Sequence, residues 1–198
     1  MYIIGTKEVI FMLTQIIEET TNAIVAAVKG VDDIADAVRE TVRDQVKGLF
    51  VDTKDVASTG MDSVTGVVTG ALSSVSSVGA SLIDISAGTI QGVVSGISET
   101  GGDVIDAISH TASSLIKESS NLGQNLGEVA VGTVRGTIKA AESVGVDSTQ
   151  AAGAAITSVI TAADAIGSEA GQSVRDALLA SAVLPRDTVE KILKGSGS

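Results

Sequence analysis

The sequence predicts an all-α protein built on one very long helix in a right-handed coiled coil, and three observations carry this prediction. Apolar residues recur every eleven positions, aromatic residues make up only 2% of the chain, and its 198 residues include a single proline. An eleven-residue period is about 3.67 residues per turn, which keeps an apolar seam facing a partner only if the helices coil right-handed. A packed globule usually relies on aromatic side chains, so this composition favours helix association.

The eleven-residue pattern is continuous from Leu13 to Leu178, and every step meets an apolar residue or glycine. Positions three, four and seven residues further on are mostly Val, Ile or Leu, which makes a stripe about 100° wide. The stripe is broader than a two-helix seam requires, so we expect four or more helices in an oligomeric bundle, tube or α-helical barrel. A helical hairpin is the alternative to a single straight helix. The predicted oligomer seam consists of Val46, Leu49, Phe50, Val68, Leu72, Val75, Leu82, Ile83, Ile90, Val93, Val94, Ile97, Val104, Ile105, Ile108, Leu115, Ile116, Leu126, Val134, Ile138, Ile156 and Ile160.

Four segments are expected along the chain. Residues 1–30 form an apolar N-terminal segment that continues into the coil, and residues 13–184 form the continuous repeat. Candidate hinges lie at 101–102, 121–123 and 145–148, where Asp147 or Ser148 is suited to cap a new helix. Pro185 ends the repeat, so residues 185–194 predict a short C-terminal helix. The terminal Gly-Ser repeat at 195–198 is interpreted as an added linker.

Glycines follow the same periodicity. At the recurring position, glycine alternates with larger residues through the centre of the chain, and a second set lies on the opposite side of the predicted helix. Small residues four apart let helix backbones approach closely, so we expect contacts on two faces. The alternative is that glycine occurs wherever little side-chain volume is needed. The predicted close-packing glycines are Gly66, Gly70, Gly79, Gly88, Gly92, Gly96, Gly101, Gly123, Gly132, Gly136, Gly145 and Gly167.

Several classes of function are disfavoured by composition. The net charge of −11 and the lack of a basic cluster argue against nucleic acid as a partner. With no cysteine and His110 as the single histidine, we expect no transition-metal site, no cofactor and no activated serine nucleophile. His110 itself is expected to be solvent-exposed. The N-terminus has no basic residues ahead of its apolar stretch, so no signal peptide is predicted and a cytoplasmic location is favoured.

Part of the repeat resembles a known family. The segments TGMDSVTGVVTGA at 59–71 and GTIQGVVSG at 88–96 resemble the 11-mer repeats of perilipins, and they are similar in style to apolipoproteins and late-embryogenesis-abundant proteins. The resemblance covers roughly residues 57–145 and implies an amphipathic helix that folds on lipid droplets or membranes. Perilipin repeats are rich in lysine, whereas Lys117 is the only lysine here between Asp55 and Glu118. Anionic membranes are therefore disfavoured, and neutral lipid remains a candidate partner.

Two functions are consistent with these patterns. The first is a self-assembling structural protein whose partner is itself, forming a homo-oligomeric rod, tube or filament; a large enough ring of helices would enclose an apolar lumen. The alternative is an amphipathic protein that folds on a lipid surface. An enzyme is not expected.

Overall fold

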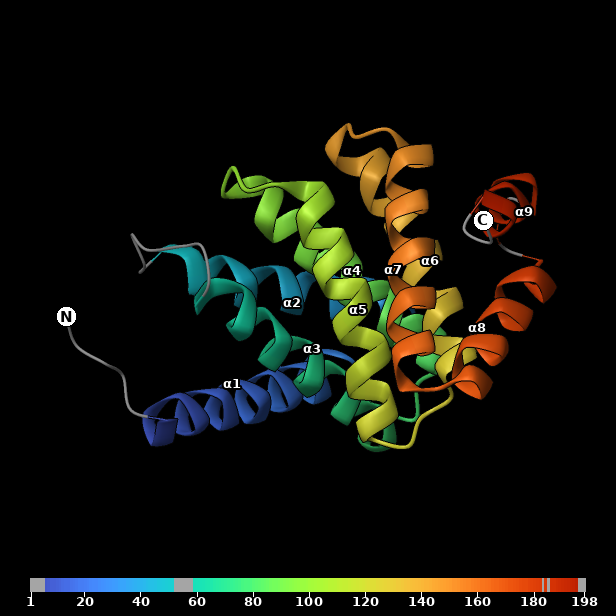
Figure 1. The fold of residues 1–198 in the computed structure, drawn as a ribbon. Helices are drawn as coiled ribbons and strands as arrows, with labels where there is room; N and C mark the ends of the chain where they lie inside the picture. The colour runs from blue at the N-terminus through green and yellow to red at the C-terminus, as the bar shows by residue number, and fades with distance from the viewer. Residues whose placement is uncertain (1–5, 52–58, 183, 185, 196–198) are drawn as a thin grey trace.

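The computed structural model describes residues 6–51, 59–182, 184 and 186–195, and these ranges contain helices and turns but no strand (Figure 1). Residues 1–5 of the predicted N-terminal segment, Pro185 and residues 196–198 of the predicted linker lie outside the described residues. The all-α prediction is confirmed. The prediction of one very long helix is wrong, because the described chain is divided into nine helices. They are α1 (Thr6–Ala27), α2 (Ile34–Val51), α3 (Thr59–Val78), α4 (Leu82–Glu99), α5 (Val104–Asn121), α6 (Leu126–Val144), α7 (Ser148–Ile166), α8 (Ser168–Ala180) and α9 (Arg186–Gly195).

The breaks between the central helices recur every 22 residues. Ser81, Asp103, Asn125 and Asp147 begin α4, α5, α6 and α7, and each side chain accepts a hydrogen bond from a backbone N–H in the first turn of its helix. Such caps satisfy donors that have no partner within the helix. A helix of 18 or 19 residues together with a short turn therefore spans two eleven-residue repeats.

The turns use glycine for a conformation that other residues rarely adopt. Gly101 has a φ of 77°, and the N–H of Gly102 bonds back to the carbonyl of Ile97 at 3.0 Å. This is the Schellman arrangement that closes a helix end. The same left-handed conformation recurs in the other three turns, at Gly79, Gly123 and Gly145. These four glycines, predicted to pack between helices, are turn residues instead.

The helices form two layers. Each helix packs most extensively on the helix two places along the chain, apart from the last helices, where α7 and α8 also pack closely together. The helices α1, α3, α5 and α7 make one layer, α2, α4, α6 and α8 make the other, and α9 covers α7 and α8 (Figure 1). Neighbours within a layer are parallel, because Gly88, Gly92 and Gly96 of α4 face Val38, Val42 and Val46 of α2 in the same order. The array has the architecture of a short helical-repeat solenoid.

A second group of the predicted glycines lies where helices within a layer touch. A Cβ atom at Gly92 would lie 2.6 Å from the carbonyl oxygen of Arg39 and 2.6 Å from the Cβ of Val42. The same close approach occurs at Gly66 and Gly70 of α3 against α1, at Gly88 and Gly96 of α4 against α2, and at Gly132 and Gly136 of α6 against α4. Gly167 belongs to neither group, since its φ of 163° is extended and nothing lies near its missing Cβ.

The residues predicted to form a seam between copies lie in one core within a single chain. Two groups can be distinguished by exposure. The buried ones are Val46, Val68, Leu72, Ile90, Val93, Val94, Ile97, Ile108, Leu115, Ile116, Val134, Ile156 and Ile160. Those half-buried against them are Leu49, Phe50, Val75, Leu82, Ile83, Val104, Ile105, Leu126 and Ile138. Helices of the same chain therefore cover the stripe that the sequence pattern assigned to partner helices. Among the described residues, no helix is both long and apolar enough to cross a membrane.

Candidate functional site

We call the layer of α2, α4, α6 and α8 the α2–α8 layer. Its first helix, α2, carries charged residues at positions where α4 carries the glycines that contact α2. Gly88 and Gly92, seven and eleven residues after the cap Ser81, let α4 approach α2. The corresponding positions after Asp33, which caps α2, are Glu40 and Asp44. Their side chains are 62% and 66% exposed. Another helix cannot pack there closely, so α2 ends the layer, as terminal repeats with polar outer faces do in solenoids.

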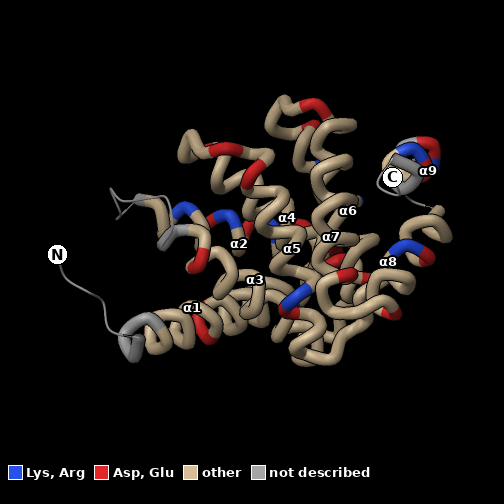
Figure 2. Tube along the Cα trace, viewed as in Figure 1, with Lys and Arg blue, Asp and Glu red and all other residues tan. Residues whose placement is uncertain are grey.

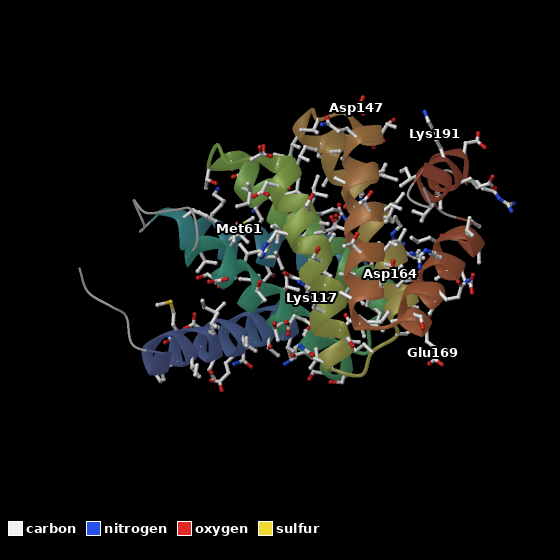
Figure 3. The ribbon with its side chains drawn as sticks, viewed as in Figure 1. Met61, Lys117, Asp147, Asp164, Glu169 and Lys191 are labelled. Carbon is white, nitrogen blue, oxygen red and sulfur yellow. The ribbon has the colours of Figure 1, made fainter. Side chains whose placement is uncertain are left out.

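The last helix of the same layer is also polar on its outer face. In α4 the surface that receives α6 includes Ile83, Ala87 and Ile90, which approach the glycines of α6. The equivalent residues of α8, counted from its start, are Glu169, Ser173 and Asp176, and all three are exposed. Figure 3 shows Glu169 pointing away from the array. Both ends of this layer are therefore closed to further helices.

The other layer begins with α1, which exposes a short apolar stretch at residues 10–12. Its buried residues, Ile16, Thr20 and Ile24, face inward, and Ile16 and Thr20 meet the glycines of α3. Three consecutive side chains are instead exposed: Ile10 at 58%, Phe11 at 72% and Met12 at 40%. We call these three residues the α1 apolar cluster. The other large apolar side chains with this degree of exposure in the described chain, Val31, Leu122, Ile166 and Leu179, belong to separate elements.

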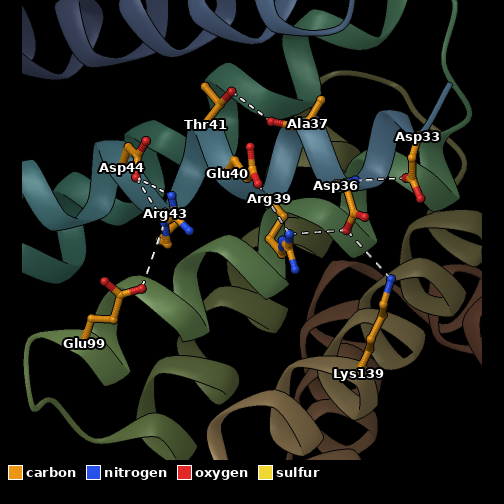
Figure 4. A network of polar contacts seen from close by, with 10 residues as sticks. All are labelled: Asp33, Asp36, Ala37, Arg39, Glu40, Thr41, Arg43, Asp44, Glu99 and Lys139. Atoms are coloured by element: carbon orange, nitrogen blue, oxygen red, sulfur yellow. Dashed lines mark hydrogen bonds and ion pairs between the residues drawn. The ribbon is translucent and has the colours of Figure 1, made fainter. Parts of the chain in front are cut away.

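Charged residues are spread over the helices of both layers (Figure 2). Figure 4 shows one network that joins α2 to α4 and α6: Asp36 lies 3.7 Å from Arg39 and 3.8 Å from Lys139, and Arg43 lies 4.0 Å from Glu99. These side chains are about one-third or more exposed, so each pair contributes little to stability.

Two further ion pairs have shorter, hydrogen-bonded geometry. Arg135 of α6 donates to Asp84 of α4 at 2.7 Å. Burial raises the pKa of the Asp84 carboxyl, but hydrogen bonds from Arg135 and Ser81 outweigh it and leave that pKa below its ordinary value. Arg175 of α8 donates to both carboxylate oxygens of Asp164 in α7, at 2.8 and 2.6 Å, and these bonds lower the pKa of Asp164 (Figure 3).

His110 lies between α5 and α3 rather than in solvent, contrary to the sequence-based expectation. It is half-buried on α5, and its Nε2 is 3.2 Å from the Oγ1 of Thr65 on α3. Ser114 Oγ is 3.3 Å from the same Thr65 oxygen. The contacts of His110 and Ser114 converge on Thr65, so the hydroxyl of Ser114 and the imidazole are not paired as a nucleophile and its base. The cluster links α3 to α5.

The described residues contain no group of three or more His, Cys, Asp or Glu side chains that could hold a metal ion. No protein-family model matches the chain, and no curated protein matches it either. Asp84, Arg135 and Lys139 were not singled out from the sequence, because their partners lie far away along the chain and only the layer arrangement brings them together.

Proposed function

We propose that this protein is a non-enzymatic structural protein that associates with further copies of itself through the α1 apolar cluster. The observation that carries the proposal is the exposure of Ile10, Phe11 and Met12 near the start of a terminal helix. Burying one large apolar side chain contributes about 1.5–3 kcal/mol, so leaving three of them in water is costly. A second copy presents the same cluster, and a two-fold pair is the smallest closed assembly that covers both.

The charged ends of the other layer favour a closed assembly. Glu40 and Asp44 at one end and Glu169 and Asp176 at the other would be desolvated by end-to-end stacking. Burying unpaired carboxylates is unfavourable. We therefore propose a small oligomer joined at α1 and not an open filament of stacked layers.

The experiment is sedimentation velocity of the full chain over a wide concentration range. We expect a reversible oligomer for the natural sequence and a monomer for the double variant Ile10→Ser, Phe11→Ser, with Leu179→Ser on α8 as the control for loss of an exposed apolar residue. A natural chain that stays monomeric at every concentration contradicts the proposal, as does a double variant that associates normally.

A lipid surface is the second candidate occupant of the same cluster. An aromatic residue and a methionine beside an isoleucine suit shallow insertion into an apolar surface. Flotation with neutral-lipid emulsion droplets tests it. Binding by a monomeric chain that the double variant loses would support this candidate over self-association.

A further inference from the structure

A cavity of about 300 Å³ lies on the α2–α8 layer, where α4 runs between α2 and α6. It is lined by Asp33, Ala35, Asp84, Gln91, Arg135 and Lys139. This volume is at the lower end of the range found for small-molecule sites. Figure 4 shows Asp33 of the α2 turn and Lys139 of α6 on either side of Asp36. The cavity is separate from the α1 apolar cluster, so a ligand could bind there whether or not the protein self-associates.

The wall of the cavity formed by α6 carries two cationic side chains with hydrogen-bond donors that lack acceptors among the described residues. Arg135 and Lys139 are four residues apart on one helix, so their side chains lie on the same face. Arg135 donates to Asp84 through Nη2, and its Nε and Nη1 have no acceptor among the described residues. The Nζ of Lys139 is 3.8 Å from Asp36 Oδ1, too far for a hydrogen bond. Both cations therefore keep donors for an anionic group.

The opposite walls offer acceptors. Gln91 is 4% exposed, and its Nε2 donates to the carbonyl of Ala87 at 3.0 Å. Its Oε1 receives no hydrogen bond from the described residues, so this is the group that Gln91 presents to the cavity. One oxygen of Asp33 accepts the N–H of Asp36, and its second oxygen has no donor in the described chain. The amide oxygen of Gln91 and a carboxylate together suit a cationic or hydroxyl donor.

We infer that this cavity binds a small organic zwitterion, a molecule that carries one carboxylate and one ammonium group as an amino acid does. The carboxylate would meet Arg135 and Lys139, and the ammonium would meet Asp33 and the Oε1 of Gln91. A ligand that is only anionic would leave the second oxygen of Asp33 without a cation, and one that is only cationic would leave Lys139 and the remaining donors of Arg135 without an acceptor. Opposite charges on opposite walls therefore select a ligand with both signs.

The test is a nuclear magnetic resonance titration of the full chain with three probes: L-glutamine as the zwitterion, succinate as the dianion and putrescine as the dication. We expect L-glutamine alone to give saturable shifts of the Gln91 side-chain amide and of backbone amides near Asp84. Lys139→Met removes one donor at an exposed position, so it should weaken L-glutamine binding about tenfold without changing the fold.

The control is Lys117→Met, which removes the same charge from α5 (Figure 3), a helix that contributes no residue to the lining of the cavity. It should leave the titration unchanged. Three results would overturn the inference: no saturable shift with L-glutamine, equal shifts with all three probes, or an L-glutamine affinity that Lys139→Met lowers no more than Lys117→Met does. Circular dichroism of each variant shows whether the helices are retained.

Discussion

Replacing Gly92 by alanine tests whether close backbone contact holds α2 against α4. In a helix that touches nothing, alanine is more stable than glycine by about 1 kcal/mol. At Gly92 the added methyl carbon would lie 2.6 Å from the backbone oxygen of Arg39 and 2.8 Å from Val42 Cγ1. A backbone carbonyl cannot rotate away as a flexible side chain can, so the two helices must separate. Overpacking of this kind costs about 1–3 kcal/mol, which cancels or exceeds the gain in helix propensity.

Gly48 in α2 provides the matched control, because nothing lies within 4 Å of its missing Cβ. We expect Gly48→Ala to stabilise the protein by about 1 kcal/mol, and the free energies of unfolding of the two variants to differ by about 1–3 kcal/mol. Urea unfolding followed by circular dichroism measures both values. If Gly92→Ala stabilises the protein as much as Gly48→Ala does, the close-contact explanation is refuted.

Three further predictions concern the turns and the ion pairs. Gly101→Ala places a side chain at a φ of 77°, and we expect it to lower the free energy of unfolding by about 1–2 kcal/mol, measured by thermal melting; an unchanged melting temperature would contradict the role of the left-handed turn. Asp103→Ala removes the cap of α5 and should cost about 1 kcal/mol in urea unfolding, whereas Asp103→Asn should restore most of it; equal losses would argue against capping. The pKa of Asp164 is lowered in the folded protein, so the stability that its ionised form contributes is present above its ordinary pKa of 3.8 and is lost as the pH falls through the folded value. Arg175→Gln should therefore reduce the loss of melting temperature between neutral and acidic pH, and a variant that loses as much as the natural chain would show that this pair is not responsible.

The sequence predicts the helical class correctly but not the number of helices, and the reason is arithmetic. A helix of 18 or 19 residues with its turn occupies 22 residues, so the eleven-residue pattern keeps its phase across every break between α4 and α7. The glycines at 101, 123 and 145 fell among the candidate hinges, and Asp147 was a candidate cap. These residues did not argue strongly enough against one continuous helix, because an unbroken eleven-residue periodicity is typical of an unbroken coiled coil.

The sequence did not predict which residues pair with one another in the polar sites, and the reason is different. Arg135 meets Asp84 because parallel helices two places apart lie side by side, and Lys139 of α6 reaches Asp36 of α2 across α4. The stripe of Val, Ile and Leu shows that a surface must be covered, but it does not distinguish helices of the same chain from those of another copy. His110 was expected in solvent because its neighbours in sequence are polar, yet Thr65 of α3 lies against it.

In the described chain, helix packing joins only helices one or two places apart, and the exposed pair of Lys139 with Asp36 is a weak link across a longer interval. Opening can therefore start at either end and advance helix by helix, because the loss of α1 leaves the contacts of α5, α6 and α7 with their own neighbours intact. Amide hydrogens in α4 to α6 should exchange slowest, with protection declining towards both termini. In such a chain the outer helices can unfold and refold locally while the amides of the central helices stay protected from exchange.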